Sequence, residues 1–270
     1  MRGKLVRAVV AGAVAVAVGV GGAARPAVAE APRTAGGDVG IMAFDWVGAV
    51  IAVAGAALNS GGGSGDLDAA VRQIIAAVEA SEQEILNHID GLASAEVKAC
   101  ARQHTIEFSD IDNMSTTVRQ LWAQNATGCA ALATAYLEAV QSRPATDAIG
   151  LAIGEIYAIT IGARARANLI NGIDLLVRDQ IRSYETLVVK LLPSCSHRWE
   201  FDDNPRHIYP VYITCEAYPG KVGTDMRLIG YLPGRPEPRV PYERAIANTD
   251  ARTSRGVALG ALPRLRTLPV

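Results

Sequence analysis

The chain has 270 residues, of which 50% are hydrophobic, 5% aromatic and 20% charged, and its formal net charge is −1. This composition fits one modest domain with a small appendage. Residues 30–232 carry 15 basic and 24 acidic side chains, whereas residues 233–270 carry seven arginines and three acids. An acidic body repels phosphates, which argues against a nucleic-acid-binding protein and leaves only the basic C-terminal segment suited to an anionic surface.

Residues 1–29 have the organisation of a secretory signal peptide. A basic start leads into an unbroken run of Ala, Val and Gly from residue 8 to residue 24, and Ala27-Val28-Ala29 then supplies the small residues that a signal peptidase reads. We therefore expect cleavage before Glu30 and a secreted, extracellular protein. An uncleaved membrane anchor is the alternative, and the short apolar run disfavours it. The polar, Gly-rich residues 30–40 are expected to form a flexible leader.

The next segment, IMAFDWVGAVIAVAGAAL at 41–58, is apolar apart from Asp45. Its length is at the lower limit for crossing a bilayer, so we interpret it as a buried helix, with membrane insertion as the alternative. A flexible NSGGGSG linker follows. Beyond the linker, apolar residues recur at spacings of three and four, which predicts an amphipathic helix from Asp66 to about Gly91.

Two further helices are predicted to form an antiparallel hairpin. Ser94 can cap the first, the polar turn SDIDNMS ends it, and the second begins at Ser115 and is closed by Pro144. Cys100 and Cys129 then lie roughly 15 and 21 Å from the turn along the two rods, so their sulfurs are nearly level. On one continuous helix they would be about 43 Å apart, too far for a disulfide. The apolar face predicted for the second helix comprises Val118, Trp122, Cys129, Leu132, Tyr136 and Val140.

Four cysteines in an exported chain indicate two disulfides, for which three pairings are open. We expect the local pairings, Cys100 with Cys129 and Cys195 with Cys215. A catalytic thiol is the alternative for any one cysteine, but an even number in an oxidising compartment leaves none over. His104 lies on the same helical stripe as Cys100, and we interpret it as a core histidine.

The stretch from Asp147 to Leu192 keeps one apolar stripe, and a kink or partial break is expected near Gly172 because a straight helix of this length would measure about 69 Å. Its nearly uncharged part, 148–163, contains Gly150 and Gly154, four residues apart, which would let helices approach closely. We interpret this part as a core helix of a soluble bundle because a glutamate lies inside it. A membrane segment is the alternative.

After Pro193 the hydrophobic period changes to two. This alternation predicts a small antiparallel hairpin or sheet over residues 194–232, stapled to the bundle by Cys195, and Pro210 indicates an edge strand. Residues 233–270, with four prolines before residue 242, are expected to form a disordered, basic tail. The predicted fold is therefore mainly α: a disulfide-braced bundle of long antiparallel helices over 41–193, a small β appendage and the tail.

Motifs that carry chemistry are scarce. The sequence contains no HExxH, P-loop, GxSxG or CxxC motif, so we expect no cofactor and no enzymatic activity. One polar cluster, HRWEFDDNPRH, combines carboxylates and imidazoles that could hold a divalent cation. Its weak candidate ligands are His197, Glu200, Asp202, Asp203 and His207. The preferred interpretation is a solvated hairpin loop that holds no metal.

Several segments of the chain are similar to those of a known group of proteins. The runs ILNHIDGLASAEVKACARQHTIEFSDIDNMS, ATGCAALATAYLEAV and LLPSC, together with the signal peptide and the apolar segment before the Gly/Ser linker, resemble exported proteins of high-GC, Streptomyces-like actinobacteria whose function is not established. The likeness covers about residues 40–195. It implies a secreted helical protein with a cysteine pair at these positions and no particular activity. The arginine-rich end departs from it.

Three hypotheses for the function follow from these patterns. The leading one is an exported, non-enzymatic helical protein that acts by contact with itself, with another protein or with the cell envelope, because long amphipathic helices occur without site chemistry. The alternative is a membrane-active protein of the helical pore-forming kind, which would transfer segments 41–58 and 148–163 to lipid without losing backbone hydrogen bonds. The third is an enzyme built on the loop from His197 to His207.

Overall fold

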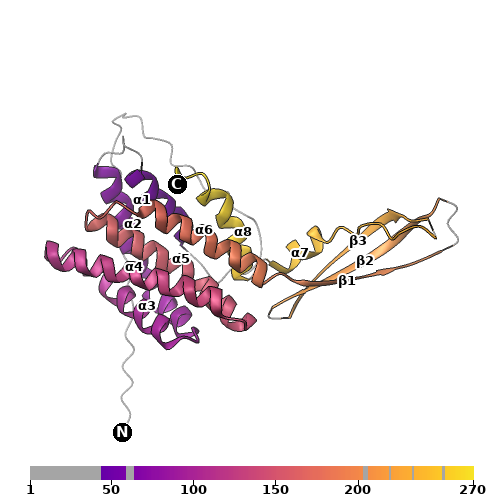
Figure 1. Cartoon of the computed structure of the whole chain (residues 1–270), viewed down its shortest axis with the longest axis horizontal. Coiled ribbons are helices and arrows are strands. Elements are labelled where there is room, and N and C mark those ends of the chain that lie inside the picture. The colour runs from indigo at the N-terminus through magenta and orange to yellow at the C-terminus, as the bar shows by residue number, and fades with distance from the viewer. Residues whose placement is uncertain (1–43, 59–63, 203–205, 219, 233, 251–252) are drawn as a thin grey trace, which may run out of the picture. The chain divides into compact units, whose positions relative to one another are not determined.

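The structure is a computed structural model that describes residues 44–58, 64–202, 206–218, 220–232, 234–250 and 253–270. The predicted signal peptide and leader lie outside these residues. The described chain is mainly α, as expected, with one small antiparallel sheet (Figure 1). Its elements are α1 (Trp46–Leu58), α2 (Ser64–Asp90), α3 (Ala95–Phe108), α4 (Thr116–Ala139), α5 (Arg143–Arg166), α6 (Ile173–Lys190), β1 (Ser194–Trp199), β2 (Ile208–Ala217), β3 (Lys221–Gly230), α7 (Glu243–Asp250) and α8 (Ser254–Leu265).

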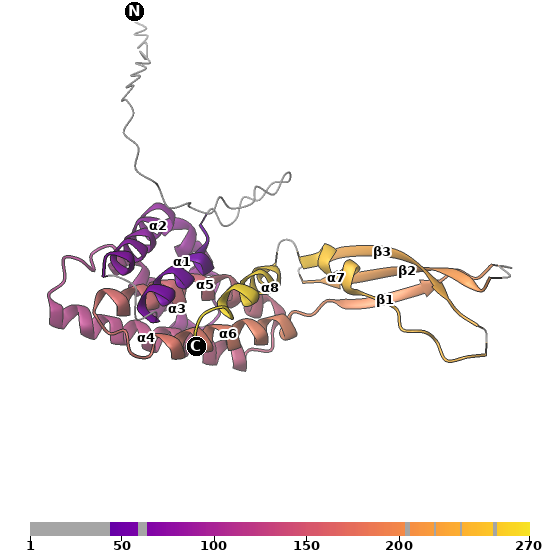
Figure 2. The ribbon, with the colours of Figure 1, turned by 90° about the horizontal axis from the view of Figure 1, so that it is seen from above.

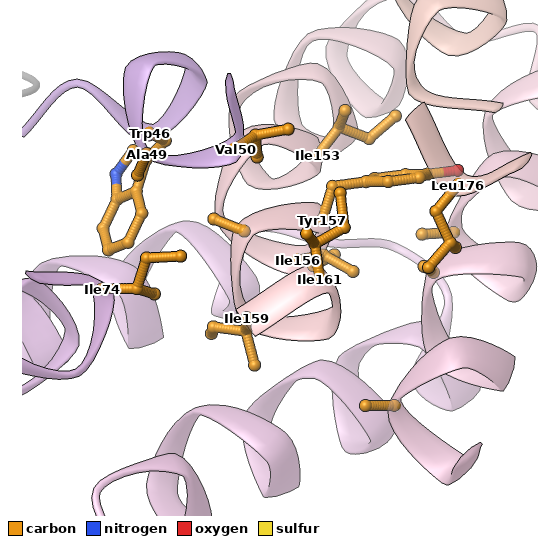
Figure 3. Close-up of a cluster of buried hydrophobic side chains, with 14 of the residues drawn as sticks. Trp46, Ala49, Val50, Ile74, Ile153, Ile156, Tyr157, Ile159, Ile161 and Leu176 are labelled. Atoms are coloured by element: carbon orange, nitrogen blue, oxygen red, sulfur yellow. The ribbon is translucent and has the colours of Figure 1, made fainter. Parts of the chain in front are cut away.

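Helix α5 is the centre of the helical body. It contacts α1, α2, α3, α4, α6 and α8, and most of its side chains are buried. In Figure 3, Ile153 and Tyr157 of α5 lie between Val50 of α1 and Leu176 of α6. The predicted buried helix in the segment 41–58 is therefore confirmed from Trp46 to Leu58, and the core-helix interpretation of 148–163 is confirmed as well.

The predicted antiparallel hairpin is confirmed by α3 and α4. The hydroxyl oxygens of Ser94 and Ser115 cap the two helices, each accepting a hydrogen bond from the amide three residues later. Across the hairpin, the Trp122 indole donates to Glu107 Oε2 over 2.6 Å, and the Cα atoms of Cys100 and Cys129 are 5.7 Å apart. The two cysteines lie at disulfide-bonding distance, as do Cys195 and Cys215 with Cα atoms 4.0 Å apart. Because Cys195 lies in β1 and Cys215 in β2, this second pair joins two strands of the sheet, and the expectation that Cys195 staples the sheet to the bundle is wrong.

The long stretch predicted from Asp147 to Leu192 is broken into two helices. Asn168 adopts a left-handed conformation with φ of 56°, and the amides of Asn168 and Leu169 bond back to the carbonyls of Ala165 and Arg164. This is a Schellman ending, which satisfies the last carbonyls of α5 and turns the chain out of the helix. Gly172, with φ of 88°, is the N-cap residue that precedes α6.

Glycines on α5 allow its neighbours to approach, as the sequence predicts. A Cβ atom on Gly150 would lie 2.6 Å from both the Leu187 side chain of α6 and the Ser254 hydroxyl of α8. A Cβ atom on Gly154 would lie 3.1 Å from the Tyr184 hydroxyl. These small residues let the core helices come closer than larger side chains would permit.

The apolar face predicted for the second hairpin helix is partly wrong. Trp122 and Cys129 are buried, but Val118 and Leu132 are exposed. The buried face of α4 is instead dominated by small residues, namely Ala123, Ala126, Ala130, Ala133 and Thr134. The reason is the close contact with α5, where the Thr160 hydroxyl donates to the backbone carbonyl of Ala126 over 3.0 Å. A larger side chain at this contact would hold the helices apart.

The prediction of a disordered tail over 233–270 is wrong for two helices, α7 and α8. All four prolines before residue 242 precede α7, so they do not interrupt either helix. Helix α8 contacts α1, α5 and α6, and therefore belongs to the helical body that was expected to end at residue 193. The apolar residues of this segment that are buried in the core are Ala258, Ala261, Leu262, Leu265 and Leu268.

Charges of the C-terminal segment are matched by acids of the body. The polar contacts are Arg264 with Asp45 (3.0 and 2.6 Å), Arg266 with Glu185 (2.5 Å) and the Ser254 hydroxyl with Asp147 (2.6 Å). Asp45, the one charge in the predicted apolar segment, also caps α1 by accepting from the Gly48 amide over 2.9 Å. Some of the arginines that could have bound an anionic surface therefore bind acidic side chains of the same chain.

The ion pair between Asp45 and Arg264 leads to a prediction about pH. Burial alone would raise the pKa of Asp45, but hydrogen bonds from Arg264 and from the Gly48 amide outweigh it and hold this pKa below its usual value. The stabilisation is therefore present above the pKa of the unfolded chain and is lost as the pH falls through the lower folded pKa. Because both side chains are about half exposed, we expect at most about 1 kcal/mol.

Thermal unfolding measured between about pH 2 and pH 6 checks this prediction, with Asp45→Asn as the control. Asparagine keeps a capping oxygen but cannot titrate, so the difference in melting temperature between the two proteins should shrink as the pH falls. A difference that is independent of pH would contradict the assignment.

The sheet has the order β1-β2-β3 with antiparallel pairing throughout. Strand β2 is central, so the edge position inferred from Pro210 is wrong for the strand as a whole. The β1 ladder ends at the pair Trp199 and Val211, and the last bond beyond it runs from the Glu200 amide to the Pro210 carbonyl over 2.9 Å. The missing amide hydrogen of Pro210 thus lies on the β1 side at the end of that ladder, where its loss is tolerated.

Candidate functional site

The two faces of the sheet have different surroundings. Odd-numbered residues of β2, including Val211, Ile213 and Cys215, are buried, as the alternation predicts. Helix α7 contacts β2 and β3 (Figure 2), and the face that it covers has a small core of its own to which Val240 and Ala245 contribute. The even-numbered residues of β2, and the residues of β3 that pair with them, face the opposite side.

That opposite side, here called the open sheet face, is exposed, and one part of it is apolar. Its apolar part comprises Ile208, Pro210 and Tyr212 of β2 and Met226 and Leu228 of β3, whereas Val222 is separated from them by the polar residues Thr214, Glu216 and Thr224 of the same face. Leu228 is 67% exposed, Val222 55% and Met226 52%. Cross-strand pairing places Pro210 beside Leu228 and Tyr212 beside Met226, so these side chains form one patch. At its margin the Arg198 guanidinium lies 5.1 Å from the centre of the Tyr212 ring.

On the covered face, the segment before α7 is held by polar contacts. The His197 imidazole lies 2.7 Å from both the Tyr242 hydroxyl and Glu237 Oε1, and the Trp199 indole donates to the same carboxylate oxygen over 2.6 Å. The bonds from Trp199 and His197 lower the pKa of Glu237 below its usual value. These contacts position the chain over β1 and give His197 a structural role.

The structure does not bring the candidate metal ligands of this loop together. His197 is paired with Ile213 of β2, whereas His207 precedes the first residue of β2, so about 20 Å of strand separates the two positions. His207 lies instead 3.2 Å from the Tyr209 hydroxyl. Asp202 is exposed, and Asp203 lies outside the described residues. The third hypothesis, an enzyme built on this loop, therefore has no assembled site among the residues that the structure describes.

Aromatic rings gather near the end of the covered face. The rings of Trp199 and Phe201 are stacked with centroids 5.9 Å apart, and Tyr231 lies within 5.9 Å of both. Phe201 also meets Tyr209 edge to face at 5.0 Å. Half of the 14 aromatic residues of the chain lie between residues 199 and 242. Composition over the whole chain did not reveal this concentration, although counting aromatic residues per segment would have done so.

The cysteine pair of the helical hairpin has a third side chain beside it. His104 is buried, and its Nδ1 atom lies 4.0 Å from the Cys100 sulfur and 2.8 Å from the Cys100 carbonyl oxygen. The prediction of a core histidine is confirmed. Among the described residues, Cys100, His104 and Cys129 are the group of three or more side chains close enough to share a metal ion.

Helix α5 is long and apolar enough to cross a membrane by length and composition, and 83% of its most apolar window is buried in the protein. Core helices of soluble proteins pass the same test, so this property alone does not assign it to a membrane. Helix α1, the other predicted apolar segment, has 13 residues. At 1.5 Å per residue α1 spans about 20 Å, less than the thickness of a bilayer core.

A polar cluster that the sequence did not reveal lies between α4, α5 and α6. The Thr134 hydroxyl is 2.6 Å from the Tyr157 hydroxyl and 2.9 Å from the Ser183 hydroxyl. Burial raises the pKa of Tyr157, so this phenol stays neutral and can donate. The Ser183 hydroxyl also donates to the Asp179 carbonyl over 2.9 Å, so a chain of hydrogen bonds links the three helices.

Comparison with known protein families, with curated proteins and with solved structures finds no match to this chain.

Proposed function

We propose that the chain is an exported, non-enzymatic protein that acts by contact, and that the open sheet face is its contact surface. The observation that carries this proposal is the apolar patch formed by Tyr212, Met226 and Leu228 with their neighbours on exposed positions of β2 and β3. The two cysteine pairs at disulfide-bonding distance are compatible with an extracellular protein. The partner is a protein, another copy of the chain or the cell envelope.

The patch is not needed to build the sheet. An antiparallel sheet with one covered face normally places polar residues on its other face. Here the covered face already has its own core around Val211 and Ile213, so Met226 and Leu228 add no packing to it. Clustered apolar side chains on an exposed face commonly mark an interaction site, whereas single exposed ones do not.

The double variant Met226→Ser/Leu228→Ser tests this proposal. We expect association of the protein with itself, or with washed cell envelopes of the producing organism, to weaken at least about tenfold, because the few side chains that each contribute more than about 1 kcal/mol cluster at the centre of an interface. Sedimentation of the labelled protein with and without envelopes measures both forms of association. The unfolding transition should be unchanged, because neither side chain is buried.

The matched control is Leu175→Ser/Val189→Ser on α6, which replaces two exposed apolar residues away from the sheet. The control should leave association unchanged. Equal loss in both variants, or no measurable association of the natural chain, would contradict the proposal.

A membrane-active protein is the second candidate, favoured by the length and apolar character of α5. Under this hypothesis α5 would exchange its protein neighbours for lipid while keeping its backbone hydrogen bonds. Release of a dye from liposomes made with neutral or anionic lipids, measured from acidic to neutral pH, tests it. Absence of leakage under all these conditions would remove this candidate and leave the contact proposal untouched.

A further inference from the structure

The strongest additional site in the described chain lies at the α3–α4 hairpin. Cys100 and His104 are one helical turn apart on α3, and Cys129 faces them from α4. Both sulfurs and one imidazole nitrogen lie within 4.8 Å of one another. Two sulfurs and one nitrogen bound to a single tetrahedral zinc ion lie about 3.5–3.8 Å apart. In this structure Nδ1 is the nitrogen that lies 4.0 Å from the Cys100 sulfur, so the imidazole must also turn Nε2 toward the two sulfurs before Nε2 can bind the ion.

The state of His104 is a second observation that indicates a ligand. Its side chain is 5% exposed, and Nδ1 lies 2.8 Å from the Cys100 carbonyl oxygen. A carbonyl oxygen only accepts, so Nδ1 carries the hydrogen and Nε2 keeps a lone pair. Nε2 is buried and has no hydrogen-bond partner among the described residues. A ring N–H bonded to a backbone carbonyl is the arrangement that commonly orients a metal-binding histidine.

The surroundings favour a neutral complex. Cys129 is buried, and the Trp122 ring lies 5.0 Å from the His104 ring. A net charge in such an apolar setting would be costly. Two thiolates, one neutral imidazole and Zn²⁺ carry no net charge, and zinc prefers sulfur and nitrogen ligands. A monovalent soft cation would leave one negative charge in the same setting.

We propose that, in the dithiol state, Cys100, Cys129 and His104 bind one Zn²⁺ ion. A dithiol reductant supplies two electrons and two protons to the Cys100–Cys129 disulfide and becomes a disulfide itself. Binding of Zn²⁺ then releases both thiol protons, since thiolates are the ligands. A disulfide oxidant that takes two electrons from the two thiolates and, with two protons from water, becomes two thiols restores the Cys100–Cys129 bond. This removes two of the three protein ligands and expels the ion, so the site holds zinc only when the pair is reduced.

The second cysteine pair is a control within the same chain. Cys195 and Cys215 are also at disulfide-bonding distance, but among the described residues no third side chain joins them in a group that could share an ion. Reduction should therefore create a zinc site at Cys100 and Cys129 and none at Cys195 and Cys215.

Zinc content of the full chain tests the proposal. The chain is reduced with a thiol-free phosphine, incubated with Zn²⁺ alone and separated from free ion, and the metal is measured by atomic emission. We expect about one ion per reduced chain and none per oxidised chain. His104→Leu should weaken binding at least about 100-fold, and Cys129→Ser should abolish it. Cys195→Ser/Cys215→Ser should leave it unchanged.

A spectroscopic readout covers the case in which a variant does not fold. With Co²⁺ in place of Zn²⁺, the reduced natural chain should show a thiolate-to-cobalt charge-transfer band and one strongly shifted imidazole resonance. The proposal would be overturned if the reduced chain took up no metal, or if uptake survived Cys129→Ser. It would also be overturned if uptake were lost with Cys195→Ser/Cys215→Ser, or if the cobalt spectrum lacked the shifted imidazole resonance.

Discussion

Leu265→Ala is expected to lower the free energy of unfolding by about 2–5 kcal/mol, the usual range for a leucine removed from a packed core. Leu265 of α8 is 0% exposed and belongs to the main core. Helix α8 packs against α1, α5 and α6, so the cavity would form where three other helices meet the C-terminal segment. Urea unfolding followed by circular dichroism measures the loss.

Leu259→Ala is the matched control, because it makes the same change on the same helix at a side chain that is 40% exposed. Its effect should stay within about 0.5 kcal/mol. Equal and small effects of the two variants would show that α8 is not part of the core and would restore the disordered tail that the sequence predicted.

The double variant Cys100→Ala/Cys129→Ala is expected to cost about 3 kcal/mol relative to the oxidised natural chain. The cross-link closes a loop with a sequence separation of 29 residues, and disulfides over loops of this size commonly contribute 2–4 kcal/mol by restricting the unfolded chain. A chelator in all samples keeps any bound metal ion from contributing to the comparison. Urea unfolding measures the loss, and hydrogen exchange shows where the chain opens more readily.

The position of the loss distinguishes the two cross-links. In the Cys100→Ala/Cys129→Ala variant, amides of α3 and α4 should exchange faster, since these helices are the ones joined. Cys195→Ala/Cys215→Ala should instead speed exchange in β1 and β2. Unchanged exchange in α3 and α4 after removal of the first pair would contradict its role as a brace.

The charge pattern of the sequence has a different meaning in the folded chain. From the sequence alone, an acidic body and a basic C-terminal segment suggest that the two parts bind different external partners. In the structure, Arg264 binds Asp45 and Arg266 binds Glu185, so the C-terminal segment is in part the partner of its own body. Fewer of these arginines are then available to an anionic surface. The apolar part of the open sheet face is a better supported place for an external contact.

Local features could be predicted because their causes lie within a few residues. Ser94 and Ser115 cap the amides three positions later, and the short polar side chains between the hairpin helices turn the chain back. That turn alone places Cys100 level with Cys129, so the cysteine pairing also followed from the sequence. The alternation in β2 predicted its buried face for the same reason.

Features that depend on distant partners could not be predicted in this way. Val118 and Leu132 are as apolar as buried residues, but α5 packs against the alanines of α4 instead. The sequence predicted His104, the third member of the cysteine cluster, only as a core residue, because the lack of a hydrogen-bond partner for its Nε2 atom follows from the tertiary structure. Which face of the sheet stays open likewise depends on α7, which covers the other face and is distant in the sequence from most of the sheet.

The sequence by itself predicted most of the helices and the β segment over residues 46–230, where the α3–α4 hairpin turns and the local cysteine pairs, because caps, turns and periodicity act over short distances along the chain. Only the tertiary structure decided which apolar surfaces are covered. Helix α8 reaches α1 across more than 200 residues, and its burial depends on how well the two surfaces fit, which no local pattern records.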